Sequence, residues 1–144
     1  MTVASDAVRP DGSSKPRPIP TPETRPYWEA VNDGRLTLPR CDACGTWMFP
    51  PRPRCAACGG STSWHELSGR GTLASYVISH RPGPGWQPDE VPFVIALVEL
   101  DEGVRMMSNL VDVAPDPAAL ALDMPLVVTF VDRDGQRLPV WRPA

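Results

Sequence analysis

The sequence has no long apolar segment. No uninterrupted apolar run approaches the ~18 residues that a membrane-spanning helix needs. Residues 1–21 carry charged side chains and lack the central apolar stretch of a secretory signal, so we expect a cytoplasmic protein that does not enter a membrane. With 144 residues, the chain has room for one ordinary domain or two very small ones, and we do not expect a large buried catalytic cavity.

Lysine and histidine are nearly absent. Lys15 is the only lysine among the 14 basic residues, and the formal net charge of -3 argues against a protein that binds nucleic acid mainly by neutralising phosphates. His65 and His80 are the only histidines, so few side chains can exchange protons near neutral pH. The motifs of α/β-hydrolases, zinc proteases and P-loop proteins are also missing. We therefore expect a protein that is not itself an enzyme.

The N-terminal third changes character at Thr21. Residues 1–21 are rich in proline, serine and charged residues and predict a disordered arm. Residues 22–34 predict a short helix, with Thr21 as its N-cap, a proline in its first turn and a glycine at its end. A helix this short is marginal alone. Tyr27 and Trp28 on its apolar face are therefore candidate contacts, either with this chain or with a partner protein.

Two Cys-x-x-Cys-Gly units, with ten residues between Cys44 and Cys55, contain every cysteine of the chain: Cys41, Cys44, Cys55 and Cys58. In such a unit both thiolates reach one metal ion at about 2.3 Å, and the glycine permits a left-handed turn that directs backbone N–H groups at sulfur. Two units close a tetrahedron and leave no open coordination position. The spacing therefore predicts a zinc ribbon over residues 35–67, with one structural zinc ion per chain.

The same cysteines allow three other interpretations. A redox pair needs one Cys-x-x-Cys at a helix start in a β–α–β context, which the sequence does not offer, and a disulfide framework does not suit a reducing compartment. Iron accepts the same four ligands, so only metal analysis separates it from zinc. Since thiolate ligation of zinc supplies about 10–16 kcal/mol and the ribbon has few large apolar residues, we expect it to unfold without metal.

Residues 68–144 predict a β-barrel. Five runs are rich in β-branched, aliphatic and aromatic residues, at positions 73–80, 93–100, 104–113, 126–131 and 137–141. Residues 116–122 predict one or two helical turns between the third and fourth runs, and this element order is that of an OB-fold barrel. The fold class is therefore mainly β: an N-terminal helix, a zinc ribbon, then a five-stranded OB-fold barrel.

Two features of the predicted barrel bear on ligand binding. Residues 69–74 match the Gly-x-Gly-x-x-Ala pattern of dinucleotide sites, but a strand pattern follows, so Gly71 indicates a bulge or tight bend instead. The long loop at residues 81–92 joins the first two strands, and in OB barrels this loop borders the usual ligand face. Trp86 on this loop is either an anchor for a ligand or partner or a lid on the barrel's own end.

The chain contains a series of short motifs whose order resembles that of a known protein family. They lie at residues 26–29, 34–36, 40–45, 49–52, 55–59, 69–72, 98–103, 124–125 and 141–143. Together they resemble the acyl-CoA-associated zinc-ribbon/OB-fold proteins, a family long catalogued as a domain of unknown function. The likeness covers about residues 22–143. One departure is the Ala-Leu pair at residues 121–122, where the family usually has Ile-Gly, and it affects only a turn.

The resemblance implies a rubredoxin-like zinc ribbon and a non-catalytic partner of acyl-CoA enzymes. Such proteins stabilise thiolases, thiolase-like aldolases, hydroxymethylglutaryl-CoA synthases or hydratases in lipid and steroid metabolism, and they help to form the CoA channel. Acyl-CoA is thus a candidate ligand, and arginine forks suit its phosphates. The candidate contacts are Arg52, Arg54, Arg81 and Arg142.

Two alternative functions remain open. OB barrels and zinc ribbons also bind single-stranded nucleic acid, but the net charge is negative and the predicted strands show no alternation of arginine and aromatic residues. Nucleic acid is therefore a less expected partner. An independent enzyme is the other alternative, and the lack of a recognisable nucleophile–base pair speaks against it.

Overall fold

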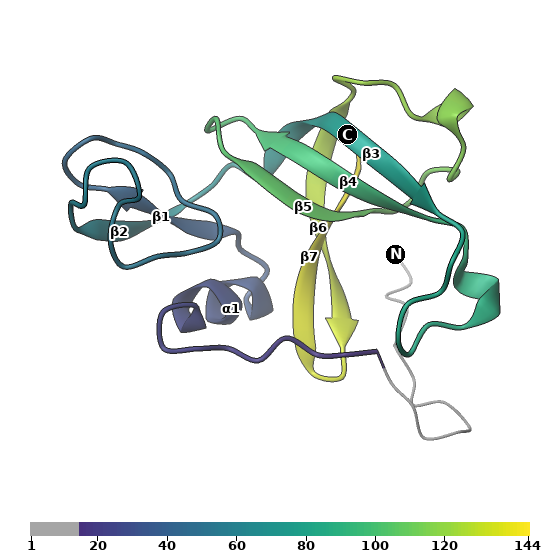
Figure 1. Cartoon of the computed structure of the whole chain (residues 1–144), viewed down its shortest axis with the longest axis horizontal. Coiled ribbons are helices and arrows are strands. Elements are labelled where there is room, and N and C mark those ends of the chain that lie inside the picture. Colours follow the sequence, from purple (N-terminus) through teal and green to yellow (C-terminus); the bar gives the residue numbers. More distant parts are fainter. Residues whose placement is uncertain (1–14) are drawn as a thin grey trace.

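The computed structural model describes residues 15–144, so the first 14 residues of the expected arm lie outside it. One α-helix, a two-stranded ribbon sheet and a closed five-stranded barrel follow one another along the chain (Figure 1). The bounds are α1 (Arg25–Asn32), β1 (Thr37–Cys41), β2 (Thr62–Glu66), β3 (Arg70–Ser79), β4 (Phe93–Leu100), β5 (Arg105–Leu110), β6 (Pro125–Arg133) and β7 (Gln136–Pro143), with short 3-10 turns η1 (Pro88–Glu90) and η2 (Pro117–Ala119). The mainly-β prediction with this order of modules is confirmed.

Helix α1 begins later than the sequence predicts. The N-cap is Thr24, whereas Thr21 starts a preceding turn in which its carbonyl oxygen accepts hydrogen bonds from Thr24 and Arg25. The physical reason is Pro26, which lacks a backbone N–H. A helix from residue 22 would need that donor, whereas a start at Arg25 places Pro26 in the first turn, where no donor is required.

The ribbon consists of two antiparallel strands that carry the metal-binding loops at one end. β1 pairs with β2 from Thr37 opposite Glu66 to Cys41 opposite Thr62, and the Leu67 N–H closes the base of the ribbon on the Leu36 carbonyl oxygen at 2.8 Å. The buried residues at the base, including Leu36 and Leu67, belong to the main hydrophobic core. The far end has only a small core of its own.

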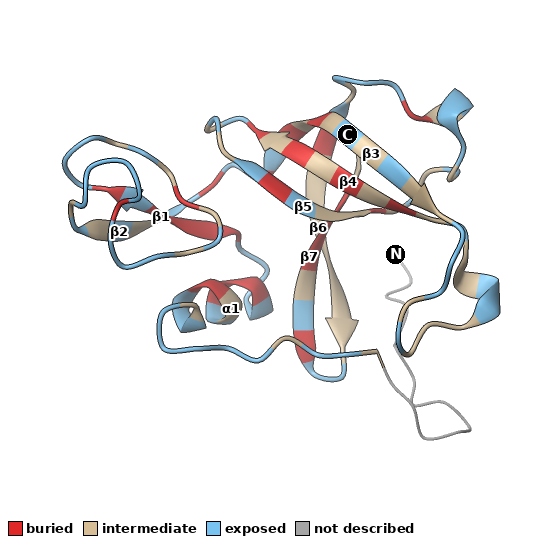
Figure 2. Cartoon of the chain, in the orientation of Figure 1, coloured by how far each residue is buried: buried red, intermediate tan, exposed pale blue. Residues whose placement is uncertain are grey.

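The barrel strands run in the spatial order β3-β4-β5-β7-β6, and β3 also pairs with β6 to close the barrel. The β5–β7 pairing is parallel and is limited to Leu110 opposite Trp141. β4 alternates between inward, buried residues and outward, half-exposed residues along its whole length. Trp141, which is fully buried, fills the interior beside Leu73 and Leu126. Figure 2 shows this buried band running through the barrel strands.

Several strand ends differ from the sequence-based prediction. β3 begins at Arg70, three residues early, and its register shifts between Leu73 and Ser75. β5 stops at Leu110, although valines at 111 and 113 continue the predicted run, because Asp112 has a left-handed φ of 57° that turns the chain out of the extended conformation. The expected turns at 116–122 shrink to the single 3-10 turn η2, capped by Asp116.

The N-terminal segment and α1 both contact the C-terminal hairpin. Asn32 of α1 accepts from the Gln136 side chain and the Arg137 backbone N–H, both at 3.0 Å. Arg17 donates to the carbonyl oxygen of Asp134 at 2.9 Å, so part of the expected disordered arm lies against the barrel instead. Within residues 15–144, no helix is long and apolar enough to cross a membrane.

Candidate functional site

The four cysteines come together at the far end of the ribbon. Their sulfur atoms all lie within 4.8 Å of one another, and none forms a disulfide. Cys41 and Cys58 sulfurs are 3.5 Å apart, and Cys44 and Cys55 sulfurs are 3.6 Å apart. Each close pair joins one cysteine of the first unit to one of the second. The site therefore exists only when the chain between the two units folds back.

The two units have the same backbone conformation. Gly45 donates to the Cys41 carbonyl oxygen at 3.0 Å, and Gly59 donates to that of Cys55 at 2.9 Å. Both glycines have left-handed φ angles, 76° and 75°. Backbone N–H groups then point at sulfur, as from Cys44 to Cys41 at 3.4 Å. This is the geometry that the Cys-x-x-Cys-Gly pattern predicts.

Hydrogen bonds distribute negative charge unevenly among the thiols. The side chain and backbone of Thr46 lower the pKa of Cys44 to about 6, and the backbone N–H of Cys44 lowers the pKa of Cys41. At Cys58 the backbone N–H of Gly60 also lowers the pKa, but the neighbouring sulfur atoms of Cys41 and Cys44 outweigh it and raise the pKa to about 12. A divalent cation is needed before all four sulfurs can be thiolates together.

The donor set fits zinc. Tetrahedral zinc with bonds of about 2.3 Å holds its sulfur ligands about 3.8 Å apart. The two pairs at 3.5 and 3.6 Å would move slightly apart and pairs nearer the 4.8 Å limit would draw together, so four-fold coordination needs only small shifts of the sulfur atoms. Cys41, Cys44, Cys55 and Cys58 would hold the zinc ion, which would cross-link the ribbon, and four thiolates would leave no position for water or substrate.

Gly60, Asp42 and Ser63 support the cysteine site, and the sequence did not predict this role. A Cβ atom on Gly60 would lie 3.1 Å from the Cys41 sulfur, so this position has to stay small. Asp42 accepts from the Ser63 hydroxyl at 2.7 Å and fixes the first unit to β2. The Gly-Gly pair after the second unit was the available signal for Gly60, whereas the Asp42 contact depends on the strand register.

The candidate arginines do not form one cluster. Arg52 and Arg54 are exposed and line the same open hollow beside the start of α1. Arg81 is exposed on the β3–β4 loop, and Arg142 is half-buried in β7. Arg52 also lines a second hollow between ribbon and barrel, where Glu102 makes the lining mixed in charge. The structure therefore brings together only the first two candidates.

The candidate aromatic residues mostly contact this chain. Tyr27 is only 4% exposed, and burial raises its pKa above the ordinary value. It packs edge-on against Trp28 and contacts Phe49 of the ribbon, so α1 docks on its own chain. Trp28 remains half-exposed at an apolar groove that also includes Met107. Trp86 stacks on Phe93 with ring centroids 4.2 Å apart, as a lid on the barrel end would.

Two family profiles match the chain. Residues 28–64 match the rubredoxin-like zinc ribbon domain of ChsH2, and residues 64–131 match its C-terminal OB-fold domain. The chain belongs to this zinc-ribbon/OB-fold family. The prediction of a rubredoxin-like zinc ribbon suited to one zinc ion is confirmed. A DUF35 domain-containing scaffold protein from Methanocaldococcus jannaschii is 34% identical over 98 residues, which cover 67% of this chain and 69% of the relative.

Larger relatives contain a region similar to this chain. The "Probable enoyl-CoA hydratase alpha subunit" of Thermomonospora curvata is 41% identical over 134 residues, which cover 90% of this chain and 40% of the relative. The "3-oxo-4,17-pregnadiene-20-carboxyl-CoA hydratase alpha subunit" of Mycobacterium tuberculosis is 38% identical over 143 residues, which cover 92% of this chain and 42% of the relative. The chain thus spans about two fifths of these hydratase subunits.

A solved structure has the same fold. A chain of the structure titled "Ltp2-ChsH2(DUF35) aldolase" superimposes with a TM-score of 0.77 at 38% sequence identity. The superposition covers 88% of this chain and 98% of that chain. The double module of ribbon and barrel therefore occurs almost alone in one relative and as part of a larger subunit in others.

Proposed function

We propose that this chain is a non-catalytic accessory subunit that binds and stabilises an acyl-CoA-processing enzyme, either a thiolase-like aldolase or a hydratase. The observation that carries the proposal is the association of one module with two reactions. The chain is 41% identical to part of a hydratase alpha subunit and 38% identical to a chain from an aldolase structure. These reactions need different arrangements of acid and base groups, so a module common to both has a supporting role.

The chemistry available on the chain supports the same role. All four cysteines are used by the zinc site, and both histidines are exposed and lie on separate modules, in β2 and after β3. The Mycobacterium tuberculosis relative is named for a CoA thioester of a steroid-derived acid. We therefore propose CoA thioesters, including steroid-derived ones, as the substrate class of the partner enzyme.

We further propose that Arg52 and Arg54 contribute to the CoA channel of the complex. Both are exposed and line one hollow, and a guanidinium fork suits a pyrophosphate or a 3′-phosphate. Arg81 and Arg142 are weaker candidates because they lie on the barrel, away from this pair. Trp28 is the aromatic residue that we propose for contact with the enzyme, since it is half-exposed.

The proposal is tested by affinity purification from the native host with identification of the proteins that co-elute. Tagged wild-type protein should carry one zinc per chain and co-elute with a thiolase-like aldolase or a hydratase. The variant Cys44→Ser should lose about one zinc per chain and lose the enzyme at the same time. Ala57→Ser, an exposed change in the second cysteine unit that keeps every sulfur, is the matched control and should retain both.

Four results would contradict the proposal. They are a partner enzyme that is stable and fully active without this chain, a Cys44→Ser variant that keeps metal and binding, turnover of an acyl-CoA by the isolated zinc-loaded chain, and salt-dependent retention of a single-stranded oligonucleotide at micromolar protein.

For the CoA channel, the double variant Arg52→Gln/Arg54→Gln should raise the KM of the complex for its CoA thioester about tenfold with kcat unchanged. Arg35→Gln, which alters an exposed arginine outside that hollow, should not change the KM.

A further inference from the structure

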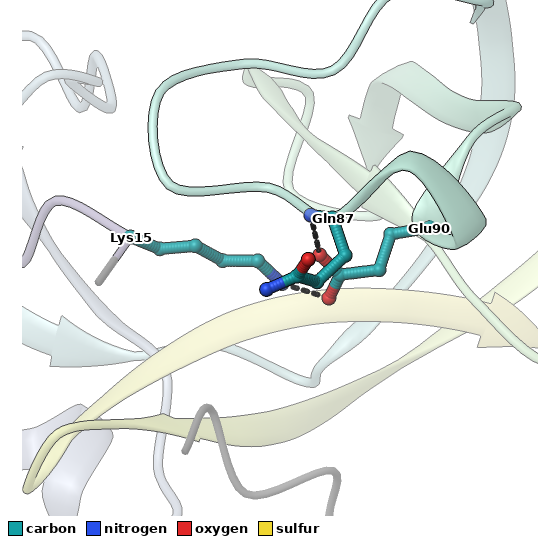
Figure 3. Close-up of polar contacts among 3 residues, drawn as sticks. All are labelled: Lys15, Gln87 and Glu90. Carbon is teal, nitrogen blue, oxygen red and sulfur yellow. Dashed lines mark hydrogen bonds and ion pairs between the residues drawn. The ribbon is translucent and has the colours of Figure 1, made fainter. Parts of the chain in front are cut away.

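Lys15, the only lysine of the chain, is held at one end of the barrel. Its side chain is 9% exposed, and its ammonium nitrogen lies 2.8 Å from a Glu90 carboxylate oxygen. Burial of an ammonium group is unfavourable unless the charge is paired, so a lysine that remains buried needs a site that accepts a cation. Figure 3 shows this side chain reaching from the N-terminal segment to the β3–β4 loop.

The carboxylate of Glu90 serves two partners at once. Its Oε1 atom pairs with Lys15, and its Oε2 atom accepts a hydrogen bond from the backbone N–H of Gln87, which begins the 3-10 turn η1 (Figure 3). The Gln87 side chain in turn accepts from the backbone of Glu90, which completes a capping box. The ion pair therefore acts directly on the group that orders this turn.

An aromatic face completes the surroundings of the ammonium group. The Lys15 nitrogen lies 4.1 Å from the ring centroid of Trp86, within the range of a cation–π interaction. Trp86 is stacked on Phe93 of β4, so the ring is fixed by the barrel itself. The carboxylate and the π face of the ring therefore both attract the ammonium group.

The site has a defined cavity beneath it. A cavity of about 190 Å³ is lined by Lys15, Trp86 and Phe93, by apolar residues of β4, β6, β7 and the end of β5, and by the polar side chains of Asn109 and Arg133. The alkyl stem of a lysine suits such a lining, because its methylene groups contact apolar side chains while the charged end reaches the carboxylate.

We propose that the mouth of the barrel is a binding site for a primary ammonium group on an alkyl stem, that Lys15 of this chain occupies it, and that this occupancy holds residues 84–92 in their conformation. The site is separate from the zinc centre and from the arginines proposed to contact CoA. It makes the segment before α1 a latch on the β3–β4 loop of the barrel.

The test uses the full-length, zinc-loaded protein and hydrogen exchange resolved to single amides. The reporters are Trp86, Gln87 and Glu90, whose N–H groups donate within the loop. In Lys15→Ala these amides should exchange about tenfold faster, while amides of β3 and β4 keep their rates. Added n-propylammonium, which replaces the atoms lost from Cγ onward, should restore slow exchange, and 1-propanol, its neutral counterpart, should not. Arg35→Ala, which removes an exposed ion pair with Asp33, is the control and should change nothing in the loop.

A second measurement uses the single lysine directly. Reductive methylation at Lys15 should be about tenfold faster in Glu90→Gln than in the wild type, because the charge that holds the ammonium group is gone. Unchanged loop exchange in Lys15→Ala would overturn the latch, and faster exchange that n-propylammonium fails to reverse would overturn the cation site. Equal methylation rates in the two proteins would also contradict the proposal.

Discussion

Several glycines of this protein are required by the local backbone, either because it is left-handed or because another atom lies too close for a side chain. Gly45 and Gly59 allow the left-handed turns that aim backbone N–H groups at sulfur, whereas Gly60 leaves room beside the Cys41 sulfur without a left-handed angle. Gly71 is a similar case in the barrel. A Cβ atom there would lie 2.5 Å from the carbonyl oxygen of Glu99 on β4, so close approach of two strands is what requires glycine.

Gly71→Ala should destabilise the protein by about 2–3 kcal/mol, because the added methyl group meets backbone that cannot move freely. The measurement is the free energy of unfolding in urea with zinc present. Gly135→Ala is the matched control: it has a left-handed φ of 87° and open space, so it should cost only about 1 kcal/mol. A Gly71 variant no less stable than the Gly135 variant would show that the strands separate to admit a methyl group.

The position of helix α1 depends on contacts with residues far away in the sequence, which a local sequence pattern does not predict. Its apolar face was visible in the sequence, and the structure buries Tyr27 and Val31 of that face. Its fixed orientation, however, also depends on Asn32, whose side chain meets Gln136 and Arg137 more than 100 residues away. Gln136 is 8% exposed, so its amide needs hydrogen-bond partners, and Asn32 is one of them beside the Arg137 carbonyl oxygen.

Asn32→Ala should lower the free energy of unfolding by about 1–2 kcal/mol, because it leaves the buried Gln136 amide and the Arg137 N–H without this acceptor. Urea unfolding followed by circular dichroism measures the change. Glu29→Ala, an exposed change on the same helix, should stay within about 0.5 kcal/mol of the wild type. Equal effects of the two substitutions would mean that the polar contact does not hold the helix.

The whole molecule contains two regions with different sources of stability. The barrel, α1 and the base of the ribbon share one core, whereas the far end of the ribbon has a small cluster formed by Cys41, Met48 and Cys55. The small cluster cannot offset the conformational entropy of the two loops without a metal ion. The two regions should therefore respond differently when zinc is removed.

Removal of zinc by a high-affinity chelator should unfold residues 41–61 and leave the barrel folded. Hydrogen exchange measures this outcome: amides of both cysteine units should lose protection, while those of β4 and β6 should keep it. Added zinc should restore the protection. Loss of protection across the barrel at the same rate would show that the molecule unfolds as one unit and that the separate core does not sustain it.

The sequence predicted those features of the fold and of the site that depend on residues close together along the chain. It identified the two cysteine units, their glycines, the element order of the barrel and the apolar face of the helix, because spacing and alternation are local properties. It misplaced the start of α1 because the missing N–H of Pro26 outweighed the cap at Thr21, and it extended β5 past Leu110 because apolar composition does not report the left-handed angle at Asp112.

The amino-acid sequence by itself determined the zinc ligands and the class of fold, since ligand spacing and strand order are fixed by covalent geometry and side-chain alternation. Only the tertiary structure decided which distant groups meet. It joined Asn32 to the last hairpin, and it brought Lys15 to Glu90 and Trp86. Such encounters follow from the closure of the barrel and the docking of the helix, because chain folding sets these distances and local spacing does not.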